Sequence, residues 1–315
     1  MAVTTHTLAF FPDHRGGRLR LRGTALVPGS DDLVAAALLL PGSGPVDRDS
    51  NAGRLRLNVT RDLAQSLARV GVASFRFDRR GVGESAGDYR SCGLDDNTRD
   101  AAAALSTMAR VAGVDPARLL VIGHSEGCVH AARLASGDWG PTAGIVGVGL
   151  LSGAAQPGGQ VLRWQTAQLQ ERLPPRLVVA LSRVGLDPVS QQARALRTMT
   201  SSTADVMRIG GARQNARWMR EFVAFDPAPV LRRVRVPTLV LTGRQDVQVD
   251  PDDVPVTAGL VTGPVETHQP EGVSHLLRQV VASSGLRDYR AQLKQPVDPG
   301  ILGLVDDWAR RVSRP

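Results

Sequence analysis

The chain has 315 residues, enough for one large α/β domain or two smaller ones, and 42% of them are hydrophobic. Its net charge of +8 comes almost entirely from arginine, because Lys294 is the only lysine, and the arginines are interleaved with 30 acidic residues. Such scattering, with only 4% aromatic residues, argues against a nucleic-acid-binding surface. The two cysteines, Cys92 and Cys128, form neither a disulfide framework nor a metal-binding pattern.

No stretch of the sequence predicts a membrane span. The longest apolar run, residues 143–155, is interrupted by glycines and is too short to cross a bilayer. Residues 1–13 lack the basic region and apolar core of a signal peptide. We therefore expect a cytoplasmic protein.

Strands and helices are predicted to alternate in the first half of the chain. An edge pair of strands is expected at 7–11 and 19–27. Continuous apolar runs, typical of strands covered on both faces, follow at 34–40, 72–77, 119–122 and 144–151. Helix-spaced apolar residues lie between them at 55–70 and 94–111. This alternation predicts a mostly parallel sheet with helices on both faces.

The strand at 119–122 leads into the sequence Gly-His-Ser-Glu-Gly at 123–127, and a helical stretch follows directly. A G-x-S-x-G turn between a strand and a helix holds its serine hydroxyl out at the top of a sheet. A Cβ at Gly123 or Gly127 is expected to collide with the neighbouring strand and helix. The helix start also places free N–H groups beside Ser125. This context favours a nucleophilic serine over a chance turn of common residues.

A loop rich in glycine and proline, residues 41–45, follows the strand at 34–40. Acyl transfer needs two N–H donors for the developing oxyanion. One is expected from Glu126, which follows the nucleophile, and the other from Ser43 in this loop. The alternative is a Gly-rich turn with no role in catalysis. A second glycine motif, at 81–83, lacks the third glycine of a dinucleotide site, so no dinucleotide is expected to bind there.

A serine nucleophile needs a base, and the base needs an orienting acid; in this architecture they follow in the order serine, acid, histidine. His275 is the preferred base because it lies on a loop beyond the strand predicted at 264–268, whereas His268 lies within that strand. His124 is expected to point elsewhere around the turn. Asp246 is the preferred acid. The alternatives, which are more typical of a helix start, are Asp250, Asp252 and Asp253.

The alternation breaks off between 154 and 230, where helix-spaced residues predict helices near 161–173, 177–184, 189–199 and 218–225. This block is too long for a connection, so we expect a helical cap, 154–230, inserted into a core of 1–153 and 231–315. The alternative is a subdomain with no role in access. Helices are also expected at 276–281 and 301–312. The large apolar side chains of the block are Trp164, Met199, Met207, Trp218, Met219 and Phe222.

The sequence resembles the α/β-hydrolase superfamily over nearly its whole length. The motifs that carry this resemblance are GHSEG at 123–127, DRRGVGES at 78–85, GRQD at 243–246 and GVSH at 272–275. With PGSGPVDRD at 41–49, the chain is similar to bacterial carboxylesterases related to acyl-CoA thioesterases and prolyl-oligopeptidase-like hydrolases. Two departures are Pro41, where many members have histidine, and Cys128, where glycine is usual.

The resemblance implies a serine hydrolase of small-molecule esters or thioesters that uses no cofactor and has Ser125, Asp246 and His275 as its triad. A peptidase or an acyltransferase would use the same triad. A catalytically silent ligand-binding member of the fold is a further alternative, against which the intact serine, acid and histidine argue. The sequence indicates neither the acyl group nor the oligomeric state.

Overall fold

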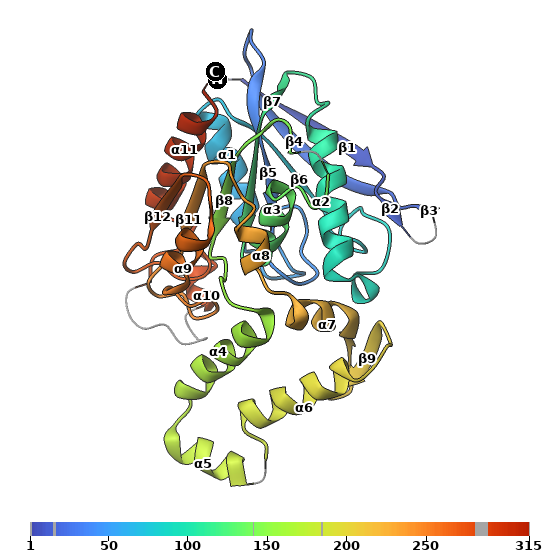
Figure 1. The fold of residues 1–315 in the computed structure, drawn as a ribbon, viewed down its shortest axis with the longest axis vertical. Helices are drawn as coiled ribbons and strands as arrows, with labels where there is room; N and C mark the ends of the chain where they lie inside the picture. Colours follow the sequence, from blue (N-terminus) through green and yellow to red (C-terminus); the bar gives the residue numbers. More distant parts are fainter. Residues whose placement is uncertain (1, 15–16, 141, 184, 281–288, 315) are drawn as a thin grey trace.

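The computed structural model describes residues 2–14, 17–140, 142–183, 185–280 and 289–314. Within these ranges, eight strands form one twisted sheet (Figure 1). β4 is antiparallel to its neighbours β1 and β6, and every other neighbouring pair is parallel. The strands follow one another across the sheet in the order β1 (Val3–Phe10), β4 (Leu21–Pro28), β6 (Ala73–Phe77), β5 (Val34–Leu40), β7 (Val114–His124), β8 (Ile145–Leu151), β11 (Thr238–Leu241) and β12 (Val265–His268).

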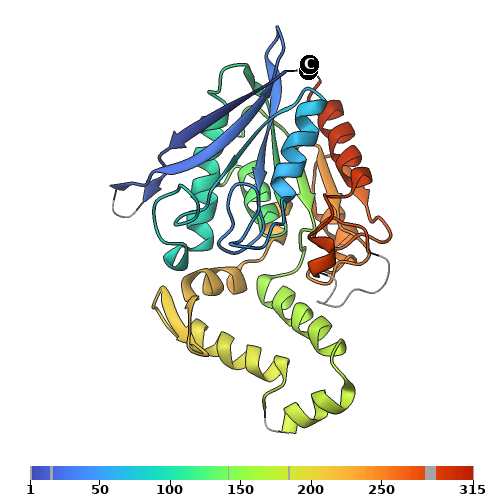
Figure 2. The same ribbon diagram turned by 180° about the vertical axis from the view of Figure 1, so that it is seen from behind.

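Helices cover both faces of this sheet, as the sequence predicts. α1 (Val59–Arg69) and α11 (Pro299–Val312) lie on one face (Figure 2). α2 (Leu94–Met108) and α3 (Gly127–Ala135) lie on the other (Figure 1). Each face has its own apolar cluster, because alternate side chains of the buried strands point to opposite sides. The predicted α/β-hydrolase fold is confirmed.

The remaining elements are shorter or lie outside the sheet. A 3₁₀ turn spans Tyr89–Ser91, and the small strands β2 (Asp13–His14) and β3 (Gly17–Arg18) pair with each other. The segment between β8 and β11 contains α4 (Gly158–Glu171), α5 (Pro175–Arg183), α6 (Pro188–Thr200), β9 (Val206–Ile209), β10 (Ala212–Asn215), α7 (Ala216–Ala224) and α8 (Ala228–Leu231). Two more helices, α9 (Asp253–Leu260) and α10 (Tyr289–Gln292), follow β11 and β12.

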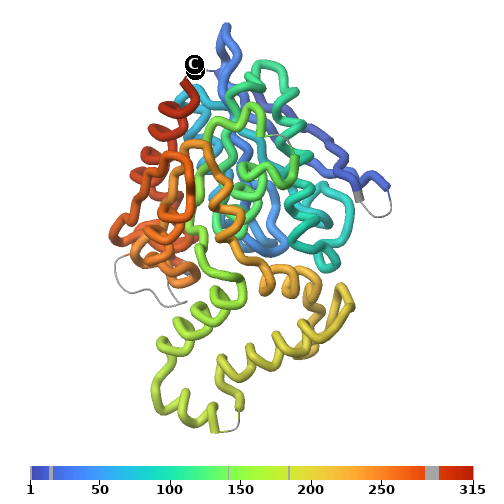
Figure 3. Tube along the Cα trace, in the orientation of Figure 1, coloured from blue at the N-terminus to red at the C-terminus, as the bar shows by residue number. Residues whose placement is uncertain are grey.

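The segment from α4 to α7 extends away from the sheet and returns beside the point where it left (Figure 3). Gly158 N donates to Phe225 O at 3.0 Å, which joins the start of α4 to the end of α7. The hairpin of β9 and β10 was not predicted. Its signal is the pair Gly210 and Gly211, whose φ angles of 57° and 82° suit a two-residue hairpin turn.

Near the C-terminus, one helix prediction is confirmed and one is wrong. The helix expected at 301–312 is α11. The helix expected at 276–281 does not form over 276–280, where Val273 and Gln279 pair as an isolated bridge, and residue 281 lies outside the described residues. Among the helices that the structure describes, none is long and apolar enough to cross a bilayer.

Candidate active site

Ser125 lies in a tight turn between the end of β7 and the start of α3, at the carboxyl edge of the sheet. Its φ of 55° is unusual for a residue with a side chain. A Cβ on Gly123 would lie 2.2 Å from the backbone of Gly127, and a Cβ on Gly127 would lie 2.2 Å from the carbonyl of Leu40. Both glycines are therefore required for α3 to approach β7 and β5 this closely, and their collisions are those the sequence predicts.

His275 and Asp246 form a buried pair on the loops that follow β12 and β11. His275 Nδ1 donates to Asp246 Oδ2 at 2.8 Å. The other carboxylate oxygen accepts from the backbone N–H groups of Gln248 at 2.8 Å and Val249 at 2.9 Å. Because a carboxylate only accepts, Nδ1 of His275 carries a hydrogen, and in the neutral ring Nε2 then keeps its lone pair.

Direct contact between the two loops brings this pair together. Gln245 N donates to Val273 O at 3.0 Å, and Arg244 N donates to Pro270 O at 3.0 Å. A Cβ on Gly243 would lie 2.1 Å from Val273 O. Glycine at 243 thus permits the approach that places Asp246 beside His275.

The residues considered as alternatives have other partners. His268 Nε2 pairs with Glu266 Oε1 at 2.8 Å, on β12. Asp250 accepts from Asp252 N, and Asp253 accepts from Ala155 N, each at 3.0 Å. Within the described residues, Ser125 Oγ forms no hydrogen bond, with His275 or otherwise. Such bonds are often long before substrate binds.

Two backbone N–H groups near Ser125 have no acceptor among the described residues. Neither Ser43 N nor Glu126 N donates to any group in the described part of the chain. Both residues line the same cavity as Ser125. A Cβ on Gly42 would lie 3.3 Å from the Cβ of Ser125, so glycine there allows the 41–45 loop to approach the serine.

The side chain of Glu126 points into a buried polar network beneath the turn. Its Oε1 accepts from Arg79 at 3.0 Å and Asn97 at 3.2 Å, and pairs with His130 Nε2 at 3.0 Å. Burial raises the pKa of Glu126, but Arg79 and His130 outweigh it and lower this pKa to about 2. Arg79 Nη2 also donates to Pro41 O at 3.3 Å, so it joins the 41–45 loop to the serine turn.

His124 supports the backbone of His275, a role that the sequence analysis missed. His124 Nε2 lies 2.8 Å from His275 O, and because a carbonyl only accepts, Nε2 carries the hydrogen. Burial lowers the pKa of His124 to about 3, so the ring is neutral at neutral pH. The two residues are 151 positions apart, and no local pattern could have indicated the contact.

A cavity of about 180 Å³ extends from Ser125 toward the helices of the inserted segment. Trp218 and Phe222 of α7 form one wall, with ring centroids 4.9 Å apart and ring planes 7° apart. α4 contributes Val161 and Leu162. The other large apolar residues singled out in this segment do not line this cavity: Trp164, Met199, Met207 and Met219.

The described residues include no group of three or more His, Cys, Asp or Glu side chains that could hold a metal ion. Cys92 and Cys128 are free thiols, both buried. Cys128 Sγ donates to Gly123 O at 3.2 Å, which places it beneath the serine turn as a packing residue.

The sequence model of the family described as Serine aminopeptidase, S33, matches residues 56–268, more than half of the chain. The matched range includes Ser125 and Asp246 and ends before His275. A search of the curated proteins found no match.

Solved structures with the same fold cover nearly the whole chain. A ferulic acid complex of Est1E from Butyrivibrio proteoclasticus has 15% identity and a TM-score of 0.62, covering 96% of this chain and 98% of that one. A thermophilic esterase from Thermogutta terrifontis has 15% identity and a TM-score of 0.59, covering 98% and 100%. A proline iminopeptidase from Mycobacterium smegmatis has 14% identity and a TM-score of 0.63, covering 98% and 99%.

At these identities the structural likeness establishes the fold, and the family match establishes the lineage. The chain is a serine hydrolase of the α/β-hydrolase fold and belongs to the serine aminopeptidase S33 family.

Proposed function

We propose that this protein hydrolyses carboxylic esters of small to medium acyl groups through an acyl-enzyme on Ser125, and that thioesters of the same acyl groups are substrates of the same site. The observation that carries this proposal is the buried His275–Asp246 pair at the sheet edge where Ser125 is held at a φ of 55°.

In the proposed mechanism Ser125 Oγ attacks the ester carbonyl while His275 Nε2 takes its proton. Asp246 holds the imidazole in the required tautomer and stabilises the imidazolium. The free N–H groups of Ser43 and Glu126 bind the oxyanion of the tetrahedral intermediate. His275 then gives the proton to the leaving oxygen. Water next attacks the carbonyl of the acyl-enzyme while His275 takes its proton, and His275 returns this proton to Ser125 Oγ as the acid leaves.

The cavity supports an ester rather than a peptide with a free amino terminus. A buried ammonium group needs a carboxylate partner. Among the described residues lining the cavity, Glu126 is the only acid, and its charge is already paired with that of the buried Arg79, which lies 3.0 Å from its Oε1. The rest of the lining is mostly apolar, with neutral polar groups such as Gln165, which suits an uncharged acyl chain.

We also propose that residues 154–230 act as a cap on a core of 1–153 and 231–315. The support is that α4 and α7 contribute lining residues to the cavity that Ser125 also lines. A cap so placed would select the acyl group while the core carries out the chemistry.

A substrate panel tests the proposed function. Purified protein is assayed against p-nitrophenyl esters of increasing acyl length, the matching acyl-CoA thioesters and aminoacyl p-nitroanilides, and labelling by a fluorophosphonate is followed by mass spectrometry. We expect ester hydrolysis and a label on Ser125. Preferential cleavage of the anilides would establish a peptidase, and the absence of both turnover and label would contradict the proposal.

A further inference from the structure

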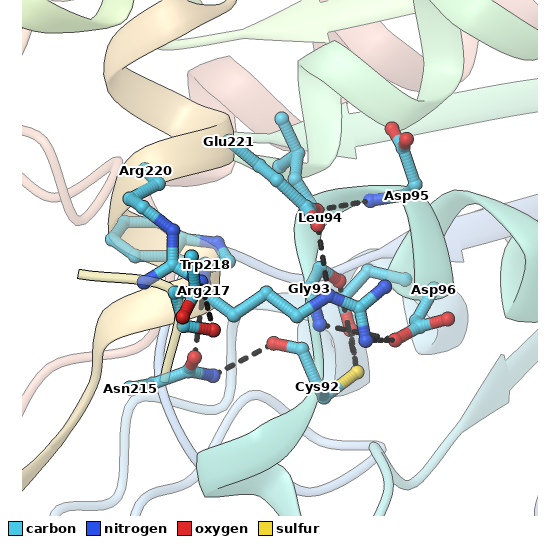
Figure 4. Close-up of polar contacts among 12 residues, drawn as sticks. Cys92, Gly93, Leu94, Asp95, Asp96, Asn215, Arg217, Trp218, Arg220 and Glu221 are labelled. Carbon is cyan, nitrogen blue, oxygen red and sulfur yellow. Dashed lines mark hydrogen bonds and ion pairs between the residues drawn. The ribbon is translucent and has the colours of Figure 1, made fainter. Parts of the chain in front are cut away.

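A set of polar contacts joins the cap to the core where α7 meets the start of α2. Asn215, which precedes α7, donates from Nδ2 to Tyr89 O at 2.8 Å and to Cys92 O at 2.7 Å (Figure 4). Its Oδ1 accepts from Trp218 N at 2.9 Å and so caps the first turn of α7. The same side chain therefore starts α7 and attaches it to the core.

Glu221 makes the second contact, one turn further along α7. Its Oε2 accepts from Asp95 N, in the first turn of α2, at 3.1 Å. The helix start at Gly93 has no side chain of its own to cap these N–H groups, so Glu221 acts as the cap from another segment. Arg217 completes the arrangement by pairing with Glu221 at 2.9 Å and with Asp96 at 2.9 Å.

Gly93 makes room for this carboxylate. A Cβ at position 93 would lie 2.4 Å from Glu221 Oε2 and 2.6 Å from Oε1, and both distances are far below van der Waals contact. Any side chain there would push Glu221 away from Asp95 N. A single methyl group on the core side can therefore displace a residue of the cap without altering α7 itself.

The same helix carries the wall of the cavity. Trp218 and Phe222 each follow a residue that contacts α2, namely Arg217 and Glu221. Of the residues of α7, all of which the structure describes, only Ala216 is fully buried, and the apolar side chains of Trp218 and Phe222 are half-buried. The polar contacts to α2 join this helix directly to the core, so they help to set where the aromatic wall stands relative to Ser125.

We propose that this polar clasp, made of Asn215, Arg217 and Glu221 with Gly93, Asp95 and Asp96, determines acyl-chain specificity. It does so by fixing the distance between Ser125 and the wall formed by Trp218 and Phe222. The proposal rests on the esterase function proposed above. The clasp residues are positioning residues, because the proposed catalysis does not require them to touch the reacting atoms.

The test compares Gly93→Ala, Glu221→Ala and the double variant across p-nitrophenyl esters from acetate to decanoate. Each single variant should raise KM for the preferred chain length about tenfold, equivalent to a loss of about 1.4 kcal/mol of binding free energy, while kcat for acetate stays unchanged. The double variant should be no worse than either single one, because the added methyl group acts only through the Glu221 carboxylate.

Two further variants separate specificity from general damage. Glu221→Gln keeps an acceptor for Asp95 N and should restore most of the wild-type chain-length profile. Glu171→Ala removes an exposed acid of α4 and should leave the profile unchanged. Equal losses for all chain lengths, or additive effects in the double variant, would overturn the clasp. A wild-type protein that cleaves no ester would instead overturn the proposed function.

Discussion

The carboxyl edge of the sheet and the proposed cap, residues 154–230, differ in how firmly their side chains are held. At the sheet edge, Asp246 and His275 are each less than 5% exposed and are hydrogen-bonded to each other. The two loops that carry them, after β11 and β12, are also joined by backbone hydrogen bonds. The structure describes all residues of α5 and α6 in this proposed cap. No residue of α5 is buried, and Met199 is the only buried residue of α6. Local opening is easiest where few apolar groups are buried.

This difference suits the separate tasks that we propose for the two regions. The proposed reacting groups need fixed positions, because small displacements cost large factors in rate. A loosely packed cap can change its wall without disturbing those groups. Substitutions at the sheet edge should therefore change rates by orders of magnitude, whereas substitutions in the cap should change preferences among substrates by much smaller factors.

The largest effect is expected from Ser125→Ala, which removes the proposed nucleophile and should lower kcat for the best ester about a million-fold. Ser152→Ala is the matched control, because Ser152 also lines the cavity and also has a positive φ, 52°. It should retain most activity. Equal losses of kcat in the two variants, with unchanged melting temperatures, would contradict the assignment of Ser125 as the nucleophile.

Asp246→Asn should come next, with kcat reduced about ten-thousand-fold, because an amide can donate to His275 Nδ1 and stabilise the wrong tautomer. Asp250→Asn changes the alternative acid nearest in sequence, whose side chain accepts only from Asp252 N in the hydrogen bonds that the structure describes. It should leave kcat near that of wild type. Steady-state assays of both variants decide between the two acids.

Local order in the sequence determines much of the carboxyl edge of the sheet, and the fold that forms this edge was predicted correctly. The apolar run before Gly123, the helix after Gly127 and the position of His275 beyond the last strand were sufficient to identify Ser125, Asp246 and His275 as candidates. Two contacts were not predicted, that of His124 with His275 and that of Glu221 with Asp95. Each joins residues more than 120 positions apart, so no local pattern indicates it. The hairpin of β9 and β10 had a local signal in Gly210 and Gly211, but its four-residue strands contain no buried apolar run that would predict them.

A third, smaller effect should appear in the pH dependence of stability. The pKa of His124 falls from 6.5 in the unfolded chain to about 3 in the fold because of burial. Between these values the unfolded state binds the extra proton, so the free energy of unfolding falls as pH decreases. One such proton contributes a slope of at most about 1.4 kcal/mol per pH unit.

His124→Gln removes this titration while offering a donor for His275 O. Urea unfolding of both proteins, from neutral pH down to about pH 5, should show wild type losing its stability more steeply than the variant. Other groups, such as Asp100, whose pKa burial raises to about 6, titrate in both proteins and cancel in the comparison. Parallel curves would show that His124 is not buried as a neutral ring.

The smallest effect is expected in the cap, from Phe222→Ala. Phe222 lines the cavity, so its removal should lengthen the space beyond Ser125 and shift the preferred p-nitrophenyl ester toward longer acyl chains. The ratio of kcat/KM between long and short esters should change roughly tenfold, the range that a few methylene groups produce in an apolar pocket.

Met219→Ala is the matched control, because Met219 lies on the same helix and does not line this cavity. It removes apolar volume from α7 without touching the wall, so it should leave the ratio unchanged even if it lowers the melting temperature. A shift with Met219→Ala as large as that with Phe222→Ala would mean that the cap acts through its overall packing rather than through its wall. That result would contradict the proposal that the cap selects the acyl chain through its cavity wall. It would leave the predictions for Ser125 and Asp246 unchanged.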